Sequence, residues 1–306
     1  MDATQAQAQA QAQTTATATA TAGAYKVAIT EQKKGQVLLF DRTAGFTDAN
    51  VLWSFSTGNA PGWDHPFEVR FRETQRYGTI ALMTFGKPGE GRAGIVDVTS
   101  KPHLTRADLM WSARITSYPH SIERVPRAGT VVVAGSRDRL HVFAPSGSDP
   151  ATLKEVQTLA FTKAHAVLWD DQNELLWVTG GTLVRTYRVK GTLRAARLEK
   201  HGRDITIAGN GHDIQPDYAR PGTLLVTDSH RVYSVDKTAR TATVIARMSY
   251  VKSYVRHAGG QAMWTADPDV EDSVWGGSTV RFSTGGDRTR PGAQIYKARL
   301  YTTRFH

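Results

Sequence analysis

Six short strand-like segments recur along the chain, and their spacing constrains the fold more than any other feature of the sequence. They are "GAYKVAITE" at Gly23, "GTIALMTF" at Gly78, "GTVVVAGS" at Gly129, "NELLWVTGG" at Asn173, "GTLLVTDSH" at Gly222 and "GQAMWTADP" at Gly260. Successive starts are 38 to 55 residues apart, near the roughly 40–50-residue period of propeller blades. The spacing therefore favours blades of one repeated architecture over unrelated hairpins.

Further strand signals follow each segment. A second run comes after a turn, as in "QVLLFD", "AGIVDV" and "RVYSVD", and a third often follows, as in "VLWSFS", "LMWSAR" and "TATVIARM". Alternating apolar residues, β-branched residues and Gly/Asp/Pro turns are typical of short strands, and helical periodicity is nearly absent. The sequence predicts an all-β fold, a six-bladed β-propeller, with seven blades as the alternative if one divergent blade has been missed.

The ends of the chain are expected to close the ring. The first blade begins at its second strand, because only a low-complexity segment precedes Gly23. The C-terminal "AQIYKARLYTT" can supply the missing innermost strand, with residues 293–303 pairing against residues 25–30. Such pairing would also remove an exposed sheet edge.

Composition limits the kinds of partner. The chain has no Cys and a formal net charge of +10, so thiolate chemistry is excluded and anionic partners are favoured. The basic residues are scattered singly, unlike a clustered nucleic-acid footprint. No apolar run approaches the ~20 residues of a membrane-spanning helix. We therefore expect neither a nucleic-acid nor a membrane partner, and we expect a monomer.

The first 22 residues are Ala/Gln/Thr repeats without apolar periodicity. We expect residues 1–22 to be a disordered leader and residues 23–306 to be one propeller domain. Ala-rich polar linkers often follow a secretion signal, so the segment also favours a secreted, extracellular protein.

Basic side chains recur at a similar place in every predicted blade. Five of them lie eight to ten residues before the start of a recurring segment, on the expected innermost strand. The sixth, Lys297, takes the same place ahead of Gly23 once the ring closes. The six residues are Arg70, His120, His165, His212, Lys252 and Lys297. Innermost strands line the channel, so we expect these side chains to converge at one mouth of it.

A cluster of like charges costs stability and is generally retained for an anionic partner. Crowding should also lower the pKa values of the histidines and keep the imidazoles neutral. The pattern predicts a site for a carboxylate, sulfate or phosphate beside a neutral His. The alternative is a single divalent metal ion held by His120, His165 and His212, which the neighbouring cations disfavour; otherwise no cofactor is expected.

Other residues are weaker candidates. Trp63 and Tyr254 could stack on a sugar ring or pack between blades, and His65 could overhang the mouth from its loop. Neighbouring strand residues point to opposite faces, so Asp213 is expected to point away from the channel that His212 enters.

The strings "PHSIE", "AHAVLWD", "GHDI", "VKS" and "IYKAR" together resemble a largely uncharacterised family of secreted bacterial β-propeller proteins. The resemblance runs over the chain after about residue 24 and implies the propeller fold. More remotely, the arrangement is similar in architecture to propeller polysaccharide lyases that act on uronate glycans.

Three functions remain open at this stage. The first is β-elimination at a uronate of an acidic glycan, with Arg70, Lys252 and Lys297 neutralising the carboxylate. In it His120, His165 or His212 would abstract the proton, and Tyr254 or another His would protonate the leaving oxygen. The second is a non-catalytic module that binds an acidic glycan or a protein. The third is a His-coordinated metal enzyme.

Overall fold

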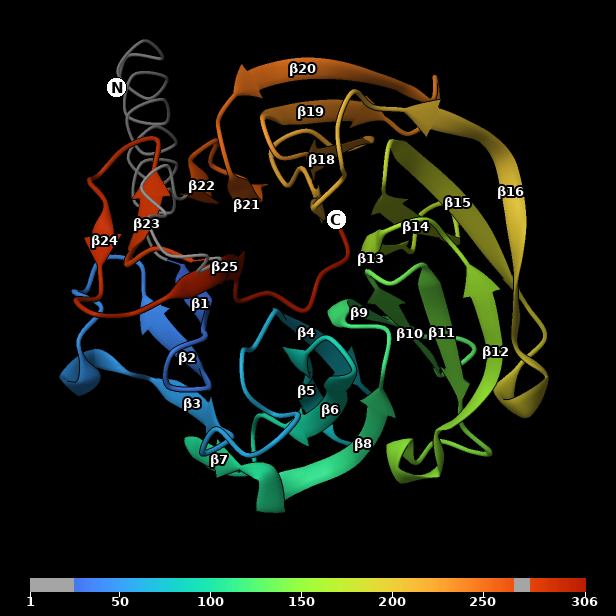
Figure 1. Ribbon diagram of the computed structural model, residues 1–306, viewed down its shortest axis with the longest axis horizontal. Helices are drawn as coiled ribbons and strands as arrows, with labels where there is room; N and C mark the ends of the chain where they lie inside the picture. The colour runs from blue at the N-terminus through green and yellow to red at the C-terminus, as the bar shows by residue number, and fades with distance from the viewer. Residues whose placement is uncertain (1–24, 267–275) are drawn as a thin grey trace, which may run out of the picture.

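The recurring apolar segments form the second strand of each sheet in the computed structural model, which describes residues 25–266 and 276–306. Six sheets are arranged in chain order around a central axis (Figure 1). The space along this axis, which side chains of the innermost strands occupy, is called the channel. The six-bladed β-propeller predicted from the repeat is confirmed. The predicted leader, residues 1–22, lies outside the described residues.

Blades are numbered here in chain order, and each is given from its innermost to its outermost strand. Blade 1 contains β25 (Ile295–Leu300), β1 (Lys26–Glu31), β2 (Gln36–Asp41), β3 (Trp53–Ser56) and β7 (His103–Thr105). Blade 2 contains β4 (Glu68–Thr74), β5 (Gly78–Lys87), β6 (Glu90–Asp97) and β8 (Leu109–Ile115). Blade 3 contains β9 (Pro119–Val125), β10 (Thr130–Gly135), β11 (Arg139–Ala144) and β12 (Lys154–Ala160).

The second half of the ring repeats this order. Blade 4 contains β13 (Ala164–Asp170), β14 (Leu175–Gly180), β15 (Leu183–Lys190) and β16 (Arg197–Thr206). Blade 5 contains β17 (Asp213–Pro216), β18 (Thr223–Thr227), β19 (Arg231–Asp236) and β20 (Thr241–Arg247). Blade 6 contains β21 (Val251–Arg256), β22 (Ala262–Ala266), β23 (Thr279–Phe282) and β24 (Arg288–Thr289). Short 3₁₀ helices η1 (Asp48–Asn50), η2 (Arg106–Asp108), η3 (Pro150–Thr152) and η4 (Leu193–Ala195) lie in the connections.

The ring closes as the sequence predicts. Strand β25 pairs antiparallel with β1, with Val27 opposite Leu300 and Ile29 opposite Ala298, and the two strands lie side by side in Figure 1. Blade 1 departs from the four-stranded pattern, because β7 pairs parallel to β3. This extra strand covers the outer edge of β3, which would otherwise expose unpaired backbone groups.

Apolar side chains fill the spaces between neighbouring blades. Val27, Ile29 and Phe40 of blade 1 pack with Val255 and Met263 of blade 6 in one buried cluster. This cluster spans the junction where the two ends of the chain meet, so closure buries apolar surface and also completes a sheet. The innermost strands are thereby held in register around the axis.

Candidate functional site

The innermost strands all begin at the same end of the channel, which we call the mouth. One residue from each blade gathers there, and the six together are called the mouth ring: Phe67, His120, His165, His212, Lys252 and Tyr296. In five blades the residue that follows a mouth-ring residue is paired with, or bonded to, a buried Thr on the second strand: Thr30, Thr84, Thr179, Thr227 and Thr265. In blade 3 the corresponding residue is Ala134, opposite Ser121.

The aromatic members of the mouth ring touch one another. The His120 ring centroid lies 4.0 Å from that of His165 and 4.5 Å from that of Phe67. His165 and His212 are 4.7 Å apart, centroid to centroid. The Tyr296 hydroxyl lies 3.5 Å from Nε2 of His165. The three histidines predicted from separate blades therefore form one cluster.

A repeated backbone distortion aims these residues at the axis. The pairing register of the inner strand shifts at His120, His165 and Lys252, so one residue in each bulges from the ladder. A β-bulge lets two consecutive side chains face the same side of a sheet. A non-glycine residue with positive φ stands two positions before the mouth-ring residue in four blades: His65, Tyr118, Lys163 and Tyr250.

Bulge geometry also explains why one expectation is wrong. Asp213 does not point away from the channel, because its carboxylate receives hydrogen bonds of 2.7 and 2.9 Å from Arg299. The amide of His212 donates to Thr227 O, the carbonyl of the residue opposite Asp213. Two successive residues thus face one partner, as in a bulge, and both side chains enter the channel.

Arg70 and Lys297 lie deeper in the channel than the sequence register placed them. Their blades present Phe67 and Tyr296 to the mouth instead. Strand β4 pairs without a bulge, with Glu68 opposite Thr84, so its channel-facing residues alternate regularly from Glu68. Lys297 Nζ lies 3.3 Å from Glu68 Oε2 and 3.4 Å from Asp213 Oδ1.

Carboxylates neutralise these deeper cations, which corrects the expected ring of uncompensated positive charge. Arg299 forms bidentate pairs with both Glu68 and Asp213, at 2.7 to 2.9 Å. One layer further, Arg72 binds Glu123 at 2.6 and 2.8 Å, and Arg70 lies 3.8 Å from the same carboxylate. These side chains are buried. Burial raises the pKa of Glu68, but the surrounding cations, Arg299 foremost, outweigh it and hold that pKa well below its usual range.

The mouth histidines are neutral at physiological pH. Burial lowers the pKa of His120 to about 3. Burial and the positive charge of nearby Lys252 together lower the pKa of His212 to about 4. Burial and the two neighbouring imidazoles lower the pKa of His165 well below its ordinary value. Each is therefore an uncharged imidazole, as the sequence analysis predicted.

The backbone fixes the tautomer of two of them. Nδ1 of His120 lies 2.9 Å from Tyr118 O, and Nδ1 of His212 lies 2.7 Å from Asn210 O. A carbonyl oxygen only accepts, so Nδ1 carries the proton in both rings. Nε2 is therefore the unprotonated nitrogen, with a lone pair available as an acceptor or a base.

Lys252 is the cationic member of the mouth ring. It lies within electrostatic reach of His120, His165 and His212. Burial and the positive charge of Lys297 lower its pKa to about 8, so the ammonium form still dominates at neutral pH. An anion bound beside Lys252 would raise its pKa again, because a negative charge favours the ammonium form.

Three further sequence candidates are not members of the mouth ring. Tyr254 packs between blades 5 and 6 with Leu225 and Val232. Trp63 is buried against Phe85, with ring centroids 5.3 Å apart. Both side chains therefore pack in the interior, which was the alternative to stacking on a sugar ring. His65 is partly exposed in the loop before β4, with Nδ1 3.3 Å from Asp64.

Two members of the mouth ring, Phe67 and Tyr296, were not predicted from the sequence. The signal that could have found them is the Thr near the end of five recurring segments, as in "AIT", "LMT" and "WVT". The residue that pairs with this Thr on the innermost strand directly follows the mouth-ring residue, so the Thr locates that residue. A count of residues back from the turn between the first and second strands is less reliable, because it includes a bulge in some blades and none in others.

The C-terminal residues cross the far end of the channel, where the innermost strands end. Arg304 O accepts hydrogen bonds from Arg72 at 3.4 Å and from the Tyr218 hydroxyl at 3.3 Å. The Arg72 guanidinium lies 4.4 Å from the Phe305 ring centroid. In Figure 1 the C-terminus lies near the centre of the ring. A ligand at the mouth ring would therefore approach from the mouth.

A second polar chain lies beside blade 3. Ser117 Oγ is 2.7 Å from His141 Nε2, and His141 Nδ1 is 2.7 Å from Glu155 Oε1. The serine is buried, and an added Cβ on Gly135 would lie 1.8 Å from its Oγ, whereas Glu155 is exposed. A catalytic serine must be accessible to its substrate, whereas here the serine is buried and the carboxylate is exposed. These hydrogen bonds therefore tie the turn before β9 to β11 and β12.

In residues 25–266 and 276–306, no group of three or more His, Asp or Glu side chains is arranged to hold a metal ion. Within the same residues, no helix is long and apolar enough to cross a membrane.

Comparisons with known proteins agree with the fold and leave the activity open. The model of a family of unknown function (DUF6528) matches residues 82–304, and no curated protein matches the chain. Solved structures of similar fold include a functionally unknown protein from Desulfotomaculum acetoxidans DSM 771, with a TM-score of 0.55 and 11% identity over 84% of this chain and 74% of that one. A protein of unknown function from Bacteroides caccae has a TM-score of 0.56 and 10% identity, over 90% of this chain and 98% of that one. A nidogen/laminin complex contains a chain with a TM-score of 0.60 and 13% identity, over 92% of this chain and 100% of that one.

Proposed function

The chain belongs to DUF6528, a family of unknown function, and we propose that its mouth ring binds a uronate of an acidic glycan and cleaves the glycan by β-elimination. One observation carries the proposal. His212 is neutral, presents an unprotonated Nε2, and lies within electrostatic reach of the Lys252 ammonium. A base beside a carboxylate-binding cation is the pair that abstraction of an acidic carbon proton requires.

Each member of the pair has a defined task. Lys252 binds the uronate carboxylate and stabilises the negative charge that spreads onto it when the C5 proton leaves. His212 Nε2 accepts that proton. The oxygen at C4 then departs with a proton from a general acid, and a double bond forms between C4 and C5. The products are a new chain end and an unsaturated uronate.

Tyr296 is suited to be the general acid. Burial raises its pKa well above the ordinary value, and the nearby tyrosine and carboxylates add to this effect, so the hydroxyl keeps its proton at neutral pH. The hydroxyl lies 3.5 Å from His165 Nε2, and the His165 ring lies 4.7 Å from that of His212, centroid to centroid. The proton that His212 takes from C5 can therefore pass through His165 and restore the Tyr296 hydroxyl after each turnover. Tyr296 takes the role that the sequence analysis gave to Tyr254.

Two features of the whole chain support this class of substrate. The net charge of +10 attracts an anionic polymer over long range. The partly exposed ring of Tyr118 contacts the buried rings of Phe67 and His120, and an aromatic side chain held in this way can pack against a sugar ring. Acidic polysaccharides lie outside cells, so the proposal extends to a secreted protein.

A non-catalytic module for acidic glycans is the second candidate. The same aromatic contacts favour it, because stacking and one cation are sufficient for binding without a base. A metal enzyme is not proposed, because the described part of the chain offers no suitable group of ligands.

The test is a panel of acidic plant, algal and bacterial glycans incubated with the protein. Elimination produces an unsaturated uronate that absorbs in the near ultraviolet, whereas hydrolysis does not. His212→Gln should lower kcat by about 10²- to 10⁴-fold with little change in binding. Lys252→Met should weaken binding by about 10- to 100-fold, because it removes a charge-assisted hydrogen bond.

His103→Gln is the matched control, because His103 is exposed on β7 at the outer edge of blade 1. This variant should behave as the unmodified protein. Tight binding without absorbance or new reducing ends would replace the lyase with the binding module. If no acidic glycan binds at all, both candidates are wrong.

A further inference from the structure

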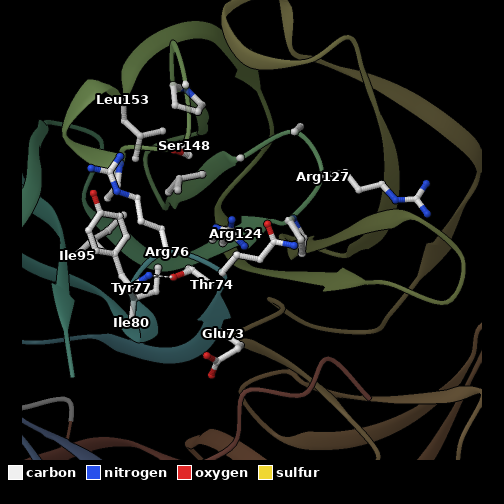
Figure 2. A pocket seen from close by; sticks show the side chains of 18 of the residues that line it. Glu73, Thr74, Arg76, Tyr77, Ile80, Ile95, Arg124, Arg127, Ser148 and Leu153 are labelled. Atoms are coloured by element: carbon white, nitrogen blue, oxygen red, sulfur yellow. Dashed lines mark hydrogen bonds between the residues drawn. The ribbon is translucent and has the colours of Figure 1, made fainter. Parts of the chain in front are cut away.

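A pocket of about 840 Å³ opens at the far end of the molecule, between blades 2 and 3. It is bordered by the turn after β4, the turn after β9 and the loop after β11, so it lies away from the mouth ring. Its floor is apolar, formed by Ile80, Ile95, Val131 and Leu153. Figure 2 shows Arg76 and Arg124 among the side chains that line the pocket, together with Ile80, Ile95 and Leu153. The volume suits a ligand of drug-like size.

Arg124 is the unusual group in this pocket. Its guanidinium is half-buried, and among the described residues it has no hydrogen bond or ion pair. The neighbouring arginines differ, since Arg72 binds Glu123 and Arg127 pairs with Glu174. Burial lowers the pKa of Arg124, and the negative charge of Glu123 opposes this shift only in part. A half-buried guanidinium whose donors have no direct acceptor costs stability and is generally retained for an anion.

A second cation stands at the rim. The Arg76 guanidinium lies 5.0 Å from the Tyr77 ring centroid and contributes to the same pocket. The planar guanidinium fork fits a carboxylate with two parallel hydrogen bonds. The pocket is also lined by Glu73, Thr74, Gln75 and Ser148, but the four apolar side chains offer a continuous surface that suits an alkyl or aryl group.

We propose that this pocket binds a small amphipathic carboxylate, with its charged group on Arg124 and its alkyl or aryl body on the floor. The ligand class differs from the glycan proposed for the mouth, and the two sites share no residue. The inference therefore stands or falls separately from the proposed function.

The test is calorimetric titration with the straight-chain carboxylates hexanoate, octanoate and decanoate, all below their micelle concentrations. Affinity should rise by about fourfold for each added methylene group, because each buries apolar surface on the floor. The alcohols of equal chain length should bind at least tenfold more weakly, because they cannot form the charged pair with Arg124. Equal affinity of acids and alcohols would overturn the role of the cation.

Arg124→Met keeps most of the apolar stem and should abolish the preference for the acid. Without ligand this variant should melt at the same temperature as the unmodified protein or higher, because a partly desolvated charge has been removed. Arg127→Met is the control for a second arginine at the border of the same pocket. Its side chain is 85% exposed and pairs with Glu174, so this variant should leave binding within about twofold, as expected for a surface ion pair.

Lys252→Met separates the two sites. Decanoate binding should be unchanged in this variant if the pocket is the site. Binding that is lost with Lys252 and retained without Arg124 would move the carboxylate to the mouth and overturn the proposal, as would affinity that is independent of chain length.

Discussion

A protein that lacks residues 293–306 will not fold cooperatively. The deletion removes β25, so β1 loses its partner strand and the ring stays open. It also removes Lys297 and Arg299, which neutralise the buried carboxylates of Glu68 and Asp213. Among the described residues, Asp213 would then have no cationic partner, and Glu68 would keep only Arg70, 3.6 Å away. An uncompensated charge in the interior costs several kcal/mol, comparable with the whole stability of a domain.

Thermal melting followed by near-ultraviolet circular dichroism measures this directly. The matched control lacks only residues 301–306, keeps β25 and should retain a sharp transition. An unchanged transition in the longer deletion would rule out closure by the C-terminal strand.

Arg299→Met will destabilise the protein by about 3–5 kcal/mol, the usual cost of breaking a buried ion pair by removing one partner. Arg299 binds two buried carboxylates at once, and no other cation in the described residues makes bidentate contacts with both. The effect should appear as a lower urea midpoint with a similar slope.

Arg281→Met is the comparison for this prediction. Arg281 pairs with Asp287 at 3.0 Å on the surface, so its loss should cost at most about 1 kcal/mol. Replacing Glu68 by Gln together with Arg299→Met should restore part of the lost stability, because one unpaired charge disappears. Equal costs for the Arg299 and Arg281 variants would show that the channel network does not stabilise the fold.

The fold could be predicted from the sequence because a propeller repeats its signals. Each blade carries an apolar second strand near a turn glycine, so a misjudged boundary in one blade is corrected by the others. Closure followed from a missing strand at one end and an unassigned strand at the other. The β7 strand could not be foreseen, since three residues of a connecting segment carry no distinct pattern.

The site could be predicted only in part, because it depends on backbone distortions. His120, His165, His212 and Lys252 reach the mouth as expected. Arg70 and Lys297 do not, because β4 has no bulge and β25 has an irregularity opposite Thr30. A bulge-like hydrogen bond from His212 N to Thr227 O at the start of β17 turns Asp213 inward, although successive strand residues normally point to opposite faces. Charge compensation escaped prediction because it joins residues far apart in the sequence, 51 positions for Arg72 and Glu123 and 86 for Arg299 and Asp213.

The central claim is that the mouth histidines are neutral and protonated at Nδ1, because the proposed base requires both. Nitrogen NMR of the ¹⁵N-labelled protein measures it without a substrate, with signals assigned through His120→Gln and His212→Gln. We predict neutral rings protonated at Nδ1, with midpoints at about 3 for His120 and about 4 for His212. Because these pKa values lie below the roughly 6.5 of an unfolded chain, the unfolded state takes up protons first, and stability should fall as the pH drops from about 6.5 towards 4. Midpoints near 6.5 in the folded protein, or rings protonated at Nε2, would contradict the account.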